Sequence, residues 1–489
     1  MSRLVFFSCL FVPSLALAQP AQPVRVPDAP ARTFDLAAAI ADGPPMTAEQ
    51  AAARALAASP TMEQARALGR AAEASVARAR AAMLPRLELT ASYAHIDGFA
   101  DGEIGIGADP ASLEAARMLA ERVSDPAART LWLGSLEQQS GTATIVIPRD
   151  RVGFGARLTW PVSDLFFAMM PALEAAEAGA RARELSIEAS QRGVQRSARE
   201  AFYQLARARG GLAVAQEAVR QAEAQRAQIE AAVRAGLMTD ADRLSAEARV
   251  ASTRQAVASA EAGVLVADAA LRAMIDADDG AVYGVAEPLL DGEVDAPAPV
   301  AASTRRALAQ RAEIQALRAQ VDARRAATQA TQASGYPHLM VYAGADYANP
   351  NRYQIPPRAE FTPSWEVGAM LTWSPNDTLG AAHQTDAMSA ETAAVEAQIT
   401  QLERAIGLEV RQAHARLGAA RTSVAAARTA REAAEAAYES RLAQLRAGHA
   451  TTAELFAAEG QLNAARFAEL DAAVQLQLAR TQLDYAIGD

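Results

Sequence analysis

The chain has 489 residues, a formal net charge of −10 at pH 7 and an aromatic content of only 5%. All 47 basic residues are Arg and are interspersed with acidic ones, which argues against nucleic-acid binding because no basic stripe is concentrated on one segment. The abundance of Ala, Arg, Glu and Gln is typical of long helices rather than of a globule with an aromatic core.

Residues 1–18 have the features of a secretory signal peptide. Arg3 supplies the positive charge, an apolar run follows, and Ala18 ends a small-x-small cleavage site. The alternatives are a membrane anchor, for which the apolar run is short, and a lipid anchor at Cys9, the only cysteine. Cleavage after Ala18 removes Cys9, which excludes disulfides and thiol chemistry from the mature protein. We therefore predict an exported protein whose membrane segments, if it has any, are strands.

The segment that follows changes its periodicity twice. Residues 19–46 are rich in Pro and Ala, which predicts an extended N-terminal arm. Helical composition runs from 47 to 83, and then apolar residues alternate with polar ones or Gly at 86–93 and again at 152–160. This alternation predicts two strands, separated by a long polar stretch that contains Gly (97–149).

A long helix is predicted next, from Leu165 to Arg234. It ends at a turn around Gly236, and a second helix returns from Thr239 to about Ile275. At 1.5 Å per residue the outgoing helix spans about 105 Å and the returning helix about 55 Å. The returning helix can therefore pack along only about half of the outgoing one.

The second half of the chain repeats this order after a linker, residues 276–302. Its predicted elements are a helix at 303–333, strands at 338–347 and 364–373 around an irregular loop, a long helix at 381–446 and a returning helix at 452–487. We therefore divide the mature chain into two structural repeats, 47–275 and 303–489. A repeat of this length indicates an internal duplication rather than a solenoid.

The two helical turns carry the duplication most clearly. "RAGLMTDADRL" at 234–244 corresponds to "RAGHATTAELF" at 446–456, so that Gly236 and Gly448, and likewise Thr239 and Thr451, are 212 residues apart. Gly at a helix end favours a left-handed cap, and Thr shortly after it favours the start of the next helix.

An apolar seam with alternating steps of four and three residues also recurs at the same offset, which predicts coiled-coil packing. It consists of Val194, Ala198, Ala201, Leu205, Ala208, Leu212 and Ala215, and of Ile406, Val410, Ala413, Leu417, Ala420, Val424 and Ala427.

This order of elements, with the two turns and the strand starts "AMLPRLEL" and "SGYPHLMV", resembles the TolC-type outer-membrane efflux proteins over nearly the whole mature chain. The resemblance implies a mainly helical protein in which four strands from each of three copies close a 12-stranded membrane barrel. Long helical hairpins would continue as a tunnel across the periplasm. It also implies a passive channel in a tripartite efflux or type I secretion system, fed by an inner-membrane transporter through a periplasmic adaptor.

The resemblance further implies roles for particular residues. The adaptor would dock on the turns at Gly236, Leu237, Thr239, Gly448 and Thr451. Glu454 matches an acidic position that narrows the periplasmic aperture, with Asp242 at the equivalent place in the first repeat; the next acidic position of the family is Ala457 here. Trp160 and Trp373 lie where strand gives way to helix, the place for aromatic residues at a membrane interface.

Two other classes of protein fit the sequence less well. A soluble periplasmic coiled-coil structural or adaptor protein would explain the seam but not the paired strands at duplicated positions. An enzyme is disfavoured because the five His residues are scattered without a metal-ligand spacing, and no Gly-rich nucleotide loop is present. We thus predict no cofactor and no metal. Drug, metal, lipid and protein substrates are not distinguished by these features.

Overall fold

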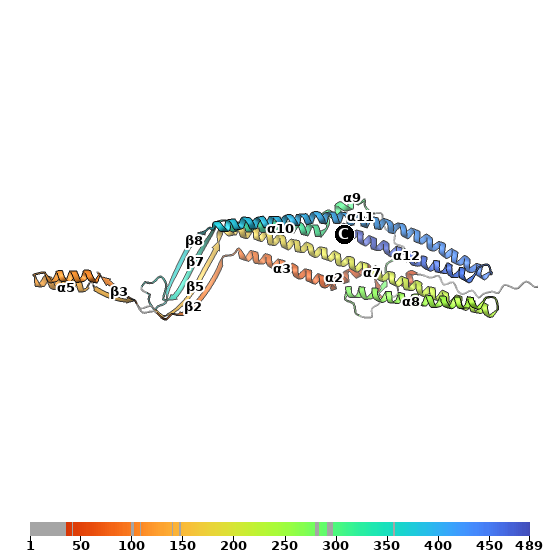
Figure 1. Ribbon diagram of the computed structural model, residues 1–489, viewed down its shortest axis with the longest axis horizontal. Helices are drawn as coiled ribbons and strands as arrows, with labels where there is room; N and C mark the ends of the chain where they lie inside the picture. Colours follow the sequence, from red (N-terminus) through yellow and green to blue (C-terminus); the bar gives the residue numbers. More distant parts are fainter. Residues whose placement is uncertain are drawn as a thin grey trace, which may run out of the picture. The chain divides into compact units, whose positions relative to one another are not determined.

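The chain is described by a computed structural model (Figure 1). The described residues are 36–41, 43–98, 102–107, 109–138, 140–145, 148–278, 283–290, 297–355 and 357–489. The predicted signal peptide, residues 1–18 with Cys9 and Ala18, lies outside them, as does most of the predicted arm.

The described residues form two compact units. The helical unit comprises the described parts of Met1–Gln64, Glu188–Arg311 and Glu403–Asp489, and the sheet unit comprises those of Ala65–Ile187 and Ala312–Leu402. Each unit therefore contains segments of both sequence repeats. The predicted repeats, 47–275 and 303–489, therefore divide the chain differently from the two compact units. The boundaries of the repeats stay a prediction.

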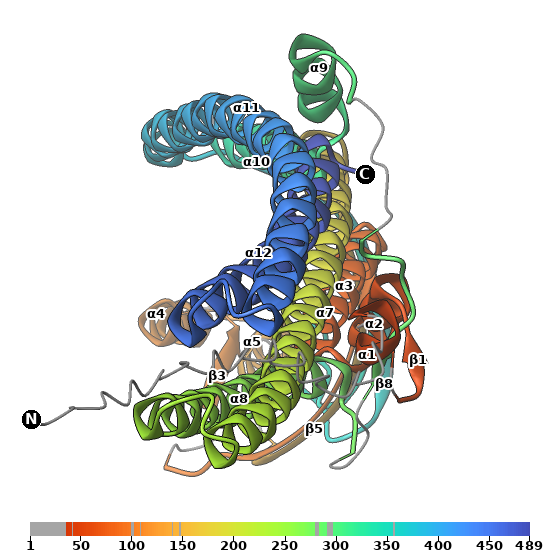
Figure 2. The ribbon, with the colours of Figure 1, turned by 90° about the vertical axis from the view of Figure 1, so that its right-hand side faces the viewer.

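Two helical hairpins dominate the helical unit (Figure 2). The first is formed by α7 (Met170–Arg234) and α8 (Asp240–Ile275), and the second by α11 (Pro375–Arg446) and α12 (Thr452–Ile487). The long helices α7 and α11 also run through the sheet unit. The predicted hairpins are confirmed, although α11 begins at Pro375 rather than near 381 because Pro is well suited to the first turn of a helix.

The predicted seam is buried more completely in the second repeat than in the first. Ile406, Val410, Ala413 and Leu417 are at most 2% exposed. In the first repeat Ala198 and Leu205 are fully buried, whereas Ala208 is only partly buried. Beside this seam α7 comes close to α12 at Gly210, where an added Cβ would lie 2.3 Å from a methyl group of Leu470.

Each of the two predicted helices that precede a pair of strands, 47–83 and 303–333, is broken into two. The first consists of α2 (Ala48–Ala58) and α3 (Pro60–Ala82), with Ser59 in an extended conformation between them. This break has a local cause, since the residue before a proline is disfavoured in the helical region.

The second break has a tertiary cause. Helices α9 (Val300–Gln310) and α10 (Ala312–Gln332) are separated by Arg311, which is extended although no proline follows it. Arg311 is only 5% exposed, and its Nη1 donates to Glu409 Oε2 at 2.5 Å. A buried guanidinium requires such a partner, which a continuous helix would not supply in the same place.

Part of the predicted extended arm is regular structure. Helix α1 (Leu36–Ile40) and strand β1 (Pro45–Met46) lie within it, and β1 pairs in parallel with β6 (Gly284–Val285) of the predicted linker. Ile40 and Met46 are 2% and 1% exposed, in a core with Phe202 and Leu271. The prediction of an extended arm over 19–46 is therefore wrong for these residues, because apolar burial holds them against the helices.

The sheet unit contains one antiparallel sheet of four strands in the order β2-β5-β7-β8 (Figure 1). Their bounds are Arg86–His95, Asp150–Pro161, His338–Asn349 and Thr362–Thr372. The four predicted strands are confirmed, and the sequence repeats meet where β5 pairs with β7. After β5 the helical conformation begins at once, with α6 (Val162–Asp164) and one π-helical turn (Leu165–Met169) before α7.

The polar stretch between β2 and β5 contains elements that its composition did not reveal. They are β3 (Gly102–Gly107), α4 (Pro110–Glu121), α5 (Pro126–Gln138) and β4 (Ser140–Ile145), with β3 and β4 paired as an antiparallel ribbon. Pro at the first position of both helices was the signal that could have placed them.

A short 3₁₀ turn (Ala333–Gly335) leads from α10 into β7.

Candidate functional site

The turns that end the two long helices have the same backbone geometry. Gly236 and Gly448 have φ angles of 73° and 75°, in the left-handed region that favours glycine. The Leu237 and His449 amides each donate to the carbonyl five residues earlier, at 2.9 and 2.8 Å. These bonds define a Schellman cap, so the predicted left-handed caps are confirmed. Leu237 is 61% exposed beside the first cap.

The helix that follows each turn starts with the same capping box. Thr239 and Thr451 accept through Oγ1 from the amides of Asp242 and Glu454, at 3.3 Å in both cases. The two carboxylates accept in return from the threonine amides, at 3.0 and 2.9 Å. Two backbone donors are thereby satisfied at each helix start, and all four side chains have a structural role there.

The two carboxylates differ in what else they contact. Asp242 is half-buried, and its Oδ1 accepts a hydrogen bond from the Thr452 hydroxyl of the other hairpin at 2.7 Å. Glu454 is exposed, and its capping bonds reach only Thr451. Asp242 therefore links the two hairpins, whereas Glu454 is exposed to solvent.

Hydrogen bonds favour the ionised form of both groups. The hydroxyl of Thr239 and then that of Thr452 lower the pKa of Asp242 below its ordinary value. The backbone amide of Thr451 lowers the pKa of Glu454 in the same way. Both side chains are consequently negative at neutral pH in the single chain.

The hairpins are also joined by buried polar residues that the sequence analysis did not single out. Glu459 of α12 is fully buried and pairs with Arg249 of α8, with Arg249 Nη2 to Glu459 Oε1 at 3.4 Å. Gln225 of α7 donates to the Tyr438 hydroxyl of α11 at 3.3 Å. Burial raises the pKa of Glu459, an effect that Arg249 partly offsets. No sequence spacing could have paired residues about 210 positions apart.

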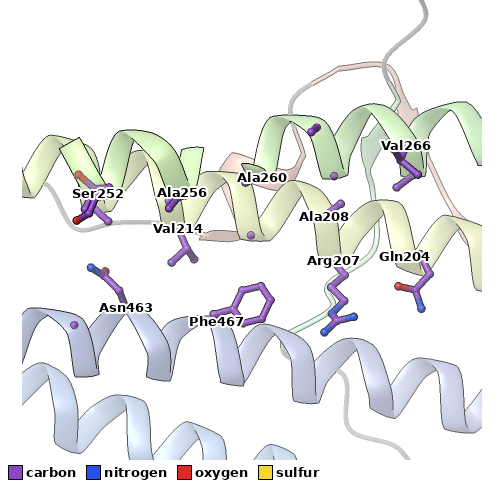
Figure 3. A pocket seen from close by; sticks show the side chains of 18 of the residues that line it. Gln204, Arg207, Ala208, Val214, Ser252, Ala256, Ala260, Val266, Asn463 and Phe467 are labelled. Carbon is purple, nitrogen blue, oxygen red and sulfur yellow. The ribbon is translucent and has the colours of Figure 1, made fainter. Parts of the chain in front are cut away.

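A cavity of about 1060 Å³ lies among α7, α8 and α12 (Figure 3). Phe467 and Asn463 of α12 line one side of it, and Val214 of α7 points toward them. Phe467 stacks beneath the Arg207 guanidinium, whose carbon lies 5.8 Å from the ring centre. Its lining residues are mostly small and apolar. Because Ala208 is one of them, the seam of the first repeat is incompletely buried at this position.

One face of the four-stranded sheet is apolar on every strand, because residues of one parity share a face. Its large exposed members are Leu87, Leu89, Tyr93, Phe154, Leu158, Trp160, Leu339, Val341, Tyr347, Trp365, Val367 and Leu371. The opposite face is mainly polar, with Glu88, Thr90, Ser92, Arg157, Thr159, Asp346, Ser364 and Glu366, although Met340, Tyr342 and Met370 also lie on it. Exposed apolar side chains on one entire face are the pattern that a lipid-facing sheet requires.

Trp160 and Trp373 lie at the junctions that the sequence predicted for them. Trp160, near the end of β5, donates through Nε1 to the Met83 carbonyl at 3.3 Å. Trp373 follows β8 and donates to Thr378 Oγ1 at 3.1 Å. They are 37% and 57% exposed, so each indole has a polar anchor and an open apolar ring.

Among the described residues, no group of three or more His, Cys, Asp or Glu side chains is placed to hold a metal ion. No helix in the described part of the chain is long and apolar enough to cross a membrane.

Solved outer-membrane channels have a similar fold. The OprN channel is 20% identical, with a TM-score of 0.67 over 90% of this chain and 89% of that one. The Campylobacter jejuni CmeC channel is 14% identical, with a TM-score of 0.70 over 90% and 85%. The open state of the Neisseria gonorrhoeae MtrE channel is 17% identical, with a TM-score of 0.69 over 90% and 88%. A search of curated protein sequences returned no match.

The family model described as "Outer membrane efflux protein" matches residues 134–276 and 304–489, which include both long hairpins and three of the four sheet strands. The match therefore rests on both sequence repeats, and the folds of the solved channels agree with it. The chain belongs to the outer membrane efflux protein family.

Proposed function

We propose that three copies of the chain form a passive tunnel, which an inner-membrane transporter supplies through a periplasmic adaptor protein. As a member of its family the chain is a channel component of the outer membrane and not an enzyme. The number of copies, the adaptor and the transporter are the proposed part.

The observation that carries the proposal is the sheet with one apolar face and two unpaired edges. Within the described residues β2 pairs only with β5, and β8 only with β7. Backbone groups at an open edge are costly in lipid, and four strands are too few to close a barrel around a pore. Pairing β8 of one copy with β2 of the next would satisfy both edges. Three copies would supply the 12 strands that the resemblance implies.

The two matching turns support a docking role for Gly236, Leu237, Thr239, Gly448 and Thr451. Each turn is a helix cap of defined geometry. In the first turn Leu237 is exposed next to the cap. Because the chain has no Gly-rich nucleotide-binding motif, energy would come from the transporter. The adaptor would contact both turns of each copy, which is a reason for their near-identical geometry.

Glu454 is proposed as the narrowest point of the periplasmic aperture. Its exposure and its low pKa would place three negative charges near one axis, favouring cations. Asp242 has a smaller part in this proposal, since it is bonded to Thr452. We also propose that the chain itself reaches the outer membrane by way of its signal peptide, which is cleaved after Ala18.

The test is the mass of the detergent-solubilised protein, measured by light scattering with correction for bound detergent. We expect a trimer and no stable folded monomer. A monodisperse folded monomer, or a protein that leaves the membrane fraction without detergent, would instead favour the soluble periplasmic coiled-coil alternative.

A further inference from the structure

The polar face of the sheet carries an ion pair that spans a whole strand. Arg157 on β5 and Glu366 on β8 lie on either side of β7, with Gly344 between them in register. Arg157 Nη2 lies 3.3 Å from Glu366 Oε1. Gly344 leaves room for the contact, because a Cβ there would lie 3.3 Å from Glu366 Cγ and 3.4 Å from its Oε1, closer than an ordinary van der Waals contact.

Glu366 also holds the loop between β7 and β8. The Tyr353 hydroxyl donates to Glu366 Oε2 at 2.8 Å, and Arg352 Nη2 lies 3.5 Å from the same oxygen. Arg352 Nη2 donates as well to Asp346 Oδ2 at 3.2 Å, and its guanidinium lies 4.8 Å from the Tyr353 ring centre. Since Asp346 and Glu366 belong to the polar face, the start of the loop is folded over that face rather than over the apolar one.

The base of the loop is held by hydrogen bonds of a buried side chain. Asn351 is only 4% exposed, and its Nδ2 donates to the Thr362 carbonyl at 2.9 Å and to Ser364 Oγ at 3.1 Å. Its Oδ1 accepts from the Tyr353 amide at 3.0 Å. Asn351 thereby joins the two ends of the loop and directs Tyr353 toward the strands, so the fold of this segment does not depend on Glu366 alone.

The loop lies at a defined end of the sheet. Strand β5 runs into α6 and α7 at its C-terminal end, and β8 runs into α11 at its own, whereas the β7–β8 loop joins the opposite ends of its strands. If the long helices face the periplasm, this loop is at the outer mouth of the channel.

We propose that residues 351–353 form an inward strap which, anchored on Glu366 and Asp346, narrows the outer mouth and limits the size of the solutes that leave. The inference rests on the proposed function, in which the polar face lines the pore. Glu366 is a positioning residue, because it acts by holding Arg352 and Tyr353. Both ion pairs of Glu366 are partly exposed, so salt weakens them and the strap can be released without unfolding the sheet.

The test is single-channel conductance of the full-length protein in planar bilayers, with polyethylene glycols of increasing mass to size the mouth. Glu366→Gln keeps the shape of the side chain but removes its charge, and Arg352→Ala removes the cation of the strap. Both should raise the conductance and admit larger polymers. Glu360→Gln is the matched control, since Glu360 contacts Gln354 and Arg358 within the same loop and should leave both values unchanged.

Limited trypsin digestion of the assembled protein provides a second measurement. Release of the strap should speed cleavage after Arg352 in Glu366→Gln, but not in Glu360→Gln. Wild-type conductance in both strap variants, together with wild-type cleavage after Arg352 in Glu366→Gln, would overturn the inference while leaving the proposed channel intact. A wild-type protein that forms no channel would overturn the proposed function, and the inference with it.

Discussion

Arg157 and Glu366 form an ion pair across the intervening strand β7, above a glycine that leaves room for both side chains. The pair joins strands that belong to different sequence repeats and that have no backbone hydrogen bonds with each other. A side chain at Gly344 would lie close to Glu366 and would compete with it for space.

Gly344→Leu should separate this pair. The new side chain would press against Glu366 and destabilise the sheet by about 1–3 kcal/mol, as expected for an overpacked position. The measurements are the thermal unfolding midpoint and trypsin cleavage after Arg352, which should become faster. Gly134→Ala is the control, because a Cβ at Gly134 meets no atom within 4 Å. An unchanged cleavage rate in Gly344→Leu would mean that Arg157 and Glu366 do not depend on the glycine.

Replacing both turn glycines with Val should abolish export while the protein remains in the outer membrane. A Cβ at Gly236 or Gly448 meets nothing within 4 Å, so the penalty is the left-handed backbone, about 1–2 kcal/mol at each position. The caps would change shape without disturbing the hairpins. Dye retention in cells and immunoblots of the outer membrane measure the two effects, with Gly263→Ala in the middle of α8 as the control. Normal export by the stably inserted double variant would rule out docking at the turns.

Glu454→Ala should lower the cation selectivity of the channel without altering its fold. The carboxylate is exposed and ionised, and three copies near one axis would repel one another unless a cation is bound. Asp242→Ala should change selectivity less, but it should loosen the contact between the hairpins by removing the acceptor of the Thr452 hydroxyl. Reversal potentials under a salt gradient measure the selectivity. Equal values for wild type and both variants would leave Glu454 with the role of a helix cap only.

Glu459 should make the stability of the helical unit depend on pH. Burial raises the pKa of this carboxyl above the value of about 4.3 that it has in an unfolded chain. Between the two values the folded protein binds more protons than the unfolded one, so stability falls as the pH rises from about 4.3 to the folded pKa.

Glu459→Gln should flatten this dependence, as measured by the thermal unfolding midpoint at several pH values. Glu247→Gln is a matched control from the other repeat: Glu247 is 212 residues earlier, its side chain is 44% exposed and it pairs with Arg243 at 2.5 Å. The control should keep the wild-type slope. The same slope in all three proteins would show that Glu459 does not titrate differently on folding.

Features that depend on a few neighbouring residues were predictable from the sequence alone. Gly236 and Gly448 adopt the left-handed cap and Thr239 and Thr451 start the next helix, because each of these conformations is decided by hydrogen bonds within about five residues. The alternation of side chains likewise determined which residues share a face of the sheet, since its period of two is a property of the strand itself. The break before Pro60 belongs to the same class.

Other features were decided by the tertiary structure because their causes lie far away in the chain. Glu247 and Glu459 occupy equivalent places in the repeats, yet the first is exposed and the second is fully buried against Arg249 of the other hairpin. The break at Arg311 depends on Glu409, and the ion pair of Arg157 with Glu366 depends on the order of strands in the sheet. A local pattern specifies the backbone of each element, but the burial of a charge is set by the element that packs against it.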